Sequence, residues 1–293
     1  MNTTMASAPA CLWDLKATLG EGVLWDGARR QVWLVDIKGR QIHRCDEDGG
    51  ARRSWDAPSQ VGFVAPLANG GMLCGLEDGL YRFDEHGGKF TPLLGVEADL
   101  PGNRFNDGHV DANGHLWFGS MDNGEQDATG VLYRFDGARV ASMDSGYIIT
   151  NGPALSPDGR TLYHTDTLAK RIYAFDLTPG GALEHKRSFI DLEAAGHPDG
   201  MAVDAEGHLW VATFGGWRID RFDPNGVKVG EVRFPCSNIT KLAFGGADLR
   251  TVYVSTARKG LSDSQLLEQP LAGGLFTFRS DTPGLAQHAL RVV

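Results

Sequence analysis

The sequence predicts an all-β fold: a single six-bladed β-propeller domain over residues 1–293, with four-stranded blades around a central channel. Two observations predict it, a high glycine content and an internal repeat. Glycine supplies 39 of the 293 residues, well above the usual share of about 7%, and it suits tight turns better than helix interiors. The repeat has units of roughly 40–50 residues, a length typical of propeller blades.

One phrase of the repeat recurs almost unchanged. Residues 110–118 read VDANGHLWF and residues 203–211 read VDAEGHLWV, with looser copies at 24–34, 67–73, 155–164 and 243–253. After each copy comes a segment with the two-residue alternation of a half-buried strand, such as LYRFD at 80–84 and again at 132–136. Six such units therefore follow one another between about residues 20 and 280.

The ends of the chain bear on how the ring closes. Residues 11–15 (CLWDL) precede the first unit, and residues 288–292 follow the last. Either segment could supply the outer strand of the sixth blade, which would protect that sheet edge. Residues 1–10 are expected to form a flexible tail, and the irregular stretches 97–104, 122–130 and 260–269 are expected to be loops at the ends of the ring.

Charge and composition restrict the partners. Lys and Arg total 28 against 37 Asp and Glu, a net charge of -9, which argues against nucleic acid because phosphate binding needs a basic face. No stretch approaches 18 consecutive apolar residues, so no membrane span is expected, and the N-terminus does not resemble a secretory signal. The four cysteines lack paired spacing and are expected to be reduced thiols. These features predict a cytoplasmic protein, expected to be a monomer.

Four polar residues occupy the same place in four predicted inner strands. Counting back five residues from the turn of units one, three, four and five gives Glu21, Asn106, Asn151 and Asp199. Propeller symmetry points all four toward one mouth of the channel, while units two and six place Gly62 and, roughly, Ile239 there. Each motif alone is also typical of an ordinary turn. Four in register favour a site whose oxygen donors suit one hard divalent cation. Ca, Mg, Mn, Zn and Fe(II) can all occupy such an oxygen-rich site, so the identity of the metal stays open.

Arg104 stands two residues before Asn106, so a strand would place both side chains on the same side. A guanidinium beside a metal site binds substrate oxygens or stabilises negative charge; the alternative is a surface Arg paired with a loop carboxylate. Arg104 and Asn106 are therefore candidate substrate-binding residues. Asp199 is the candidate catalytic residue, as a metal ligand or as the base that accepts a proton from the attacking water.

Several motifs together resemble the SMP-30/gluconolactonase family, also called regucalcin-like, particularly its bacterial sugar-acid lactonases. They are GEG at 20–22, RFNDG at 104–108, GSM at 119–121, NG at 151–152, PDGM at 198–201 and TARKGL at 256–261. The resemblance implies a six-bladed propeller with one divalent metal held by Glu21, Asn151 and Asp199. It also implies a substrate-binding role for Arg104, and places Asn106 nearby as a direct or water-mediated ligand and a substrate contact. Some members use an acidic residue in the loop after GSM, which here reads DNGEQ at 122–126.

The function expected from the resemblance and the metal site is hydrolysis of a small sugar aldonolactone, such as xylono-, arabinono- or gluconolactone, to its aldonic acid. One alternative is a metal-dependent aryl-ester or phosphotriester hydrolase on the same fold. Another is a metal-binding or interaction propeller without enzymatic activity, because a propeller fold alone does not determine function.

Overall fold

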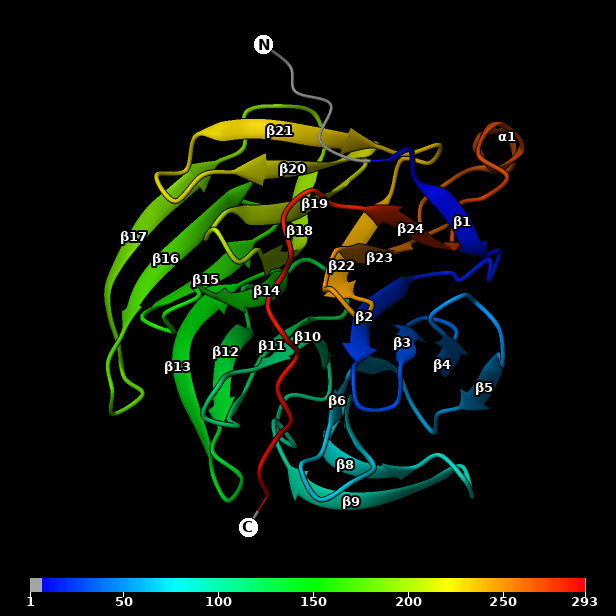
Figure 1. Ribbon diagram of the computed structural model, residues 1–293. Helices are drawn as coiled ribbons and strands as arrows, with labels where there is room; N and C mark the ends of the chain where they lie inside the picture. The colour runs from blue at the N-terminus through cyan, green and yellow to red at the C-terminus, as the bar shows by residue number, and fades with distance from the viewer. Residues whose placement is uncertain (1–6, 293) are drawn as a thin grey trace.

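The computed structural model describes residues 7–292 and confirms the six-bladed β-propeller (Figure 1). Six antiparallel sheets of four strands each form the blades. Neighbouring inner strands contact one another around the whole ring, and the last contacts the first. These inner strands are β2 (Gly20–Asp26), β6 (Val61–Pro66), β10 (Asn103–Val110), β14 (Thr150–Leu155), β18 (His197–Val203) and β22 (Ile239–Gly245).

The other strands of the first five blades follow outward in chain order. Blade one continues with β3 (Gln31–Asp36), β4 (Gln41–Asp46) and β5 (Arg53–Asp56), and blade two with β7 (Met72–Leu76), β8 (Gly79–Asp84) and β9 (Lys89–Gly95). Blade three adds β11 (Leu116–Asp122), β12 (Gly130–Phe135) and β13 (Val140–Tyr147). Blade four adds β15 (Thr161–Asp166), β16 (Arg171–Leu177) and β17 (Leu183–Asp191), and blade five β19 (Leu209–Phe214), β20 (Arg218–Phe222) and β21 (Lys228–Arg233).

The N-terminal segment closes the ring. In blade six, β23 (Thr251–Thr256) and β24 (Leu275–Arg279) are followed by β1 (Ala10–Trp13) as the outermost strand. Of the two segments that could close the ring, the N-terminal one does so, and it covers the edge of β24. The expected tail 1–10 is therefore too long, because Ala10 already pairs with β24; residues 1–6 lie outside the described residues.

The C-terminal segment has a different place, across one end of the channel. Residues 284–292, here called the C-terminal strap, pass over the centre of the ring (red in Figure 1). The Leu290 amide donates to Pro66 O at 2.8 Å, and the Arg291 amide donates to Gly114 O at 3.0 Å. The strap thus ties blades two and three to blade six at the end of the channel where the inner strands finish.

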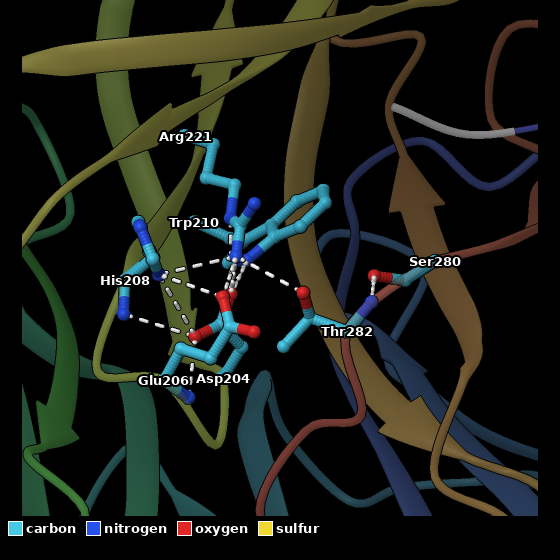
Figure 2. Close-up of polar contacts among 7 residues, drawn as sticks. All are labelled: Asp204, Glu206, His208, Trp210, Arg221, Ser280 and Thr282. Atoms are coloured by element: carbon cyan, nitrogen blue, oxygen red, sulfur yellow. Dashed lines mark hydrogen bonds and ion pairs between the residues drawn. The ribbon is translucent and has the colours of Figure 1, made fainter. Parts of the chain in front are cut away.

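The repeated VDA-x-GHLW phrase builds the same turn twice at that end. In blade five, Asp204 Oδ2 accepts hydrogen bonds from Trp210 Nε1 at 2.9 Å and from Arg221 Nη2 at 2.6 Å (Figure 2). In blade three, Asp111 Oδ2 accepts from Trp117 Nε1, also at 2.9 Å. The repeat is therefore structural: a buried aspartate ties the turn to the tryptophan of the next strand.

The expected loop at 260–269 contains the helix α1 (Asp263–Glu268). Ser262 and Gln265 form a capping box at its start, but six residues are too few to show a helical period in the sequence. Within residues 7–292, no helix is long and apolar enough to cross a bilayer. The four cysteines are unpaired, and three of them are buried.

Candidate functional site

The four polar residues predicted to share a register do lie in inner strands, each beside an irregularity of strand pairing. The pairing of each inner strand with its neighbour shifts next to Glu21, Asn106, Asn151 and Asp199. Glycines allow this locally, since Gly22 and Gly152 have φ of 57° and 76°, values that residues with a Cβ rarely adopt. A bulge bends the strand and re-aims a side chain, and here the bulges recur at one level of the channel.

Hydrogen bonds join three of the predicted residues in a row. Arg104 Nη1 donates to Asn106 Oδ1 at 2.6 Å, and Asn106 Nδ2 donates to Asn151 Oδ1 at 2.8 Å. Asn151 Nδ2 in turn donates to Thr167 Oγ1 at 2.9 Å. Arg104 and Asn106 therefore face the same side, as their spacing predicts, and Asn106 connects the guanidinium to Asn151.

Glu21 and Asp199 bring two carboxyl groups together on the other side of the site. Their side chains are 2% and 4% exposed and hydrogen-bond each other. Burial, followed by the charge of Asp107, raises the pKa of Glu21 to about 8. Burial, followed by the charge of Glu21, raises the pKa of Asp199 well above its usual value. The two groups therefore hold a proton at neutral pH as long as no cation lies between them.

Arg104 is a buried guanidinium with donor capacity left over. Burial lowers its pKa to about 10, and among the nearby carboxylates Glu125 opposes that shift most. Its Nη1 also donates to Phe105 O at 3.0 Å, whereas the buried Nε has no hydrogen-bond partner in the described structure. An unpaired buried donor is costly, so Nε is suited to a ligand oxygen.

Two further charged residues at the site were missed from the sequence, Asp107 and Lys241. Strand alternation predicts that Asp107 points away from Asn106, but the bulge between Phe105 and Gly108 breaks that alternation. Asp107 Oδ1 forms a buried ion pair with Lys241 Nζ. The sequence predicts no charged side chain at this level in blades two and six, where it places Gly62 and Ile239, and this is wrong for blade six because Lys241 of β22 pairs with Asp107. The signal in the sequence that could have identified Lys241 is the presence of a lysine within a predicted inner strand.

The donor set fits a hard divalent cation. Glu21, Asp199 and the Asn151 carboxamide supply oxygen ligands, and the proton held by the two carboxyl groups would be exchanged for the positive charge of the ion. In the part of the chain that the structure describes, no three His, Cys, Asp or Glu side chains gather as a metal-binding group. The proposed set has only two carboxylates, with Asn151 as its third member.

Comparisons with known proteins agree with this fold. The family described as SMP-30/Gluconolactonase/LRE-like region matches residues 19–258. The chain is 36% identical over 289 residues to the L-arabinolactonase of Azospirillum brasilense, covering 96% of this chain and 95% of that protein. It is 32% identical over 290 residues to the 6-deoxy-6-sulfogluconolactonase of Pseudomonas putida, covering 98% of each. The crystal structure of regucalcin, a calcium-binding protein from Agrobacterium tumefaciens, matches with a TM-score of 0.94 and 30% identity, covering 98% of each chain.

Proposed function

Because the chain belongs to the SMP-30/gluconolactonase/LRE-like family, we propose that it hydrolyses a sugar aldonolactone to the aldonic acid with the help of one divalent cation. The observation that carries this proposal is the buried Glu21–Asp199 carboxyl pair next to the unpaired Nε of Arg104. A cation site beside a free guanidinium donor suits an uncharged ester whose carbonyl oxygen gains negative charge during hydrolysis.

In this proposal Glu21, Asn151 and Asp199 would hold the cation, and Asp199 has a second task as the base. When bound, the cation polarises the lactone carbonyl. Asp199 accepts a proton from the attacking water as the water oxygen bonds to the carbonyl carbon. The ring C–O bond then breaks, and the former ring oxygen leaves as a hydroxyl after taking up that proton.

Arg104 and Asn106 position the substrate. Arg104 Nε donates to a substrate oxygen, and its charge offsets the negative charge that develops on the carbonyl oxygen. Asn106 keeps the guanidinium in place, because its Oδ1 accepts from Arg104 while its Nδ2 donates to Thr150 O at 2.6 Å. The reaction needs no covalent nucleophile, since a lactone is an activated ester that water attacks directly.

The substrate class that we propose is a lactone of a five- or six-carbon sugar acid. Support comes from the names of two relatives, an L-arabinolactonase and a 6-deoxy-6-sulfogluconolactonase. The matching regucalcin is a calcium-binding protein, which supports a divalent cation, and Ca, Mg, Mn, Zn and Fe(II) are the ions to compare.

Proton release in a pH-stat tests the proposal. We expect the protein to release acid faster than spontaneous opening on at least one of arabinono-, xylono- and gluconolactone. A chelator should abolish the excess rate, and one of the five cations should restore it. No excess release on any lactone with any of these cations would contradict the proposal. Release on aryl esters or phosphotriesters alone would identify a different hydrolase.

A further inference from the structure

A loop of blade three lies at the mouth of the channel, directly after the strand that pairs with Arg104. Residues 122–127, here called the roof loop, follow β11, in which Met121 pairs with Arg104. The Asp122 carboxylate accepts hydrogen bonds from the backbone amides of Gly124 at 3.0 Å, Gln126 at 2.8 Å and Asp127 at 3.0 Å. The roof loop therefore has a turn of its own, held by Asp122.

Two lysines from other blades hold the tip of this loop. Lys259, which follows β23 in blade six, forms an ion pair with Glu125. Lys38, in the turn between β3 and β4 of blade one, donates to Asn123 Oδ1 at 2.6 Å. In a closed ring of six blades, blade three lies opposite blade six. The roof loop therefore crosses the channel axis above Glu21 and Asp199.

The other side of the site is also bridged between blades three and six. The buried ion pair of Lys241 with Asp107 joins β22 to β10 and forms a floor under the site. A cavity of about 420 Å³ lies beyond it, along the later halves of the inner strands, with Lys241 on one side and residues 285–288 of the C-terminal strap on the other. The floor and the strap together obstruct entry from that end of the channel.

The site between roof and floor is closed. Glu21, Arg104, Asn106, Asn151 and Asp199 are each at most 4% exposed. A sugar lactone has to come from solvent into contact with these side chains, and their low exposure means that one of the covering elements has to move to admit it. The roof loop is held by side-chain contacts of two partly exposed lysines, whereas the floor is a buried ion pair between two inner strands.

We propose that Lys259 and Lys38 are positioning residues that hold the roof loop closed over the site, place Glu125 against Arg104, and release the loop to admit substrate. The kinetic part of this inference rests on the proposed lactonase function; the structural part does not. A half-exposed ion pair stabilises a closed conformation only weakly, so the closed loop can open repeatedly.

Hydrogen exchange tests the closure without any substrate. We expect the amides of residues 122–127 to exchange about two- to fivefold faster in Lys259→Met and in Lys38→Met, and faster still in the double variant. Lys259→Arg should keep the charge and restore the slow exchange. Arg30→Met is the matched control, because it removes an exposed ion pair, that of Arg30 with Glu47, in the turns that follow β2 and β4. Unchanged exchange in the double variant would overturn the proposal.

Kinetics then separate positioning from a merely structural role. On the preferred lactone we expect KM to rise roughly three- to tenfold in Lys259→Met, because the loop must be ordered at each binding event. The kcat of the variant should stay within about threefold of that of the parent protein. Its cation affinity and its thermal midpoint of unfolding should equal those of the parent. A parallel fall of cation affinity and thermal midpoint would overturn the positioning role. If no lactone is hydrolysed, the proposed function fails, while the exchange experiment still decides whether the lysines close the loop.

Discussion

Asp199 and Asp204 belong to the same blade, five residues apart, and both are buried, yet their surroundings differ. Asp204 Oδ1 accepts from the backbone amides of Glu206 and His208, each at 3.0 Å, and its Oδ2 accepts from the Trp210 indole and the Arg221 guanidinium. Asp199 accepts one backbone hydrogen bond, from Gly200 at 2.9 Å, and faces a second carboxyl group, that of Glu21.

The difference separates a structural carboxylate from a functional one. A buried charge with a guanidinium and several donors around it is compensated within the fold. A buried carboxyl against another carboxyl is not compensated, and its pKa rises until a proton or a cation supplies the missing charge. Strongly perturbed carboxyl groups in a channel are typical of functional sites. Asp199, near the start of β18, thus has a functional role, and Asp204, directly after β18, has a structural one. Each of the following experiments tests this distinction.

The largest effect is expected for Asp199→Asn. The amide keeps the size and one oxygen but cannot accept a proton from water at neutral pH. Turnover at saturating cation should fall by roughly 10²–10⁴-fold, measured in a pH-stat with spontaneous lactone opening subtracted. The fold should persist, because the amide can still donate a hydrogen bond to the Glu21 carboxylate. Turnover within about threefold of the parent would leave Asp199 as a ligand only.

Arg221→Met should act in the opposite way, on stability rather than on chemistry. Removing one partner of a buried ion pair costs about 3–5 kcal/mol of unfolding free energy, measurable by urea denaturation. Cation affinity and kcat of the folded protein should be unchanged. Arg134→Met is the matched control in blade three, where the arginine contacts His115 at 2.9 Å, and it should cost less, about 1–2 kcal/mol. Loss of cation binding in folded Arg221→Met would contradict the distinction between a structural Asp204 and a functional Asp199.

Glu21→Gln should weaken cation binding by at least about tenfold while the fold survives. The substitution removes one of only two anionic groups in the proposed ligand set, and charge count is a main determinant of affinity at such sites. Calorimetric titration with each of the five cations measures the effect. An unchanged dissociation constant in a folded variant would remove Glu21 from the ligand set.

The last expected effect is a pH dependence of the stability of the metal-free protein. The pKa of Glu21 rises from 4.5 to about 8 on folding, so between these values the folded state keeps a proton that the unfolded state has lost. The free energy of unfolding should therefore fall as pH rises from about 5 to 8. Urea unfolding with chelator present measures the slope. Asp199→Asn should reduce the slope, because it removes a second carboxyl group, whose pKa burial and the charge of Glu21 raise. An equal slope in parent and variant would contradict a raised pKa of Asp199 in the folded protein.

Much of this molecule is predictable because its sequence repeats. The recurring turn phrase identifies six blades, and counting back from that turn finds Glu21, Asn106, Asn151 and Asp199 in one register. That count succeeds because every blade obeys the same strand geometry, so equal distances along the chain become equal heights in the channel. Arg104 follows from the two-residue period alone.

The residues that were missed lie where that regularity ends. Asp107 reaches the channel because a bulge interrupts the alternation of side chains along β10. The neighbouring sequence does not indicate how many residues that bulge includes. The contact of Lys241 with Asp107 and the contact of Lys259 with Glu125 each join residues 134 positions apart. Neither follows from local spacing, because each crosses the ring from blade six to blade three.

The sequence by itself determined the six blades, the shared register of the four polar residues and the place of Arg104, since these depend on local periods that repeat. Only the tertiary structure decided that β1 and not the C-terminus closes the ring, and that the C-terminal strap crosses the far end of the channel instead. It also decided that Glu21 meets Asp199 and that the roof loop lies over both. The physical reason is ring closure: it brings distant segments into contact, and only their combined burial and charge determine which carboxyl groups keep a proton.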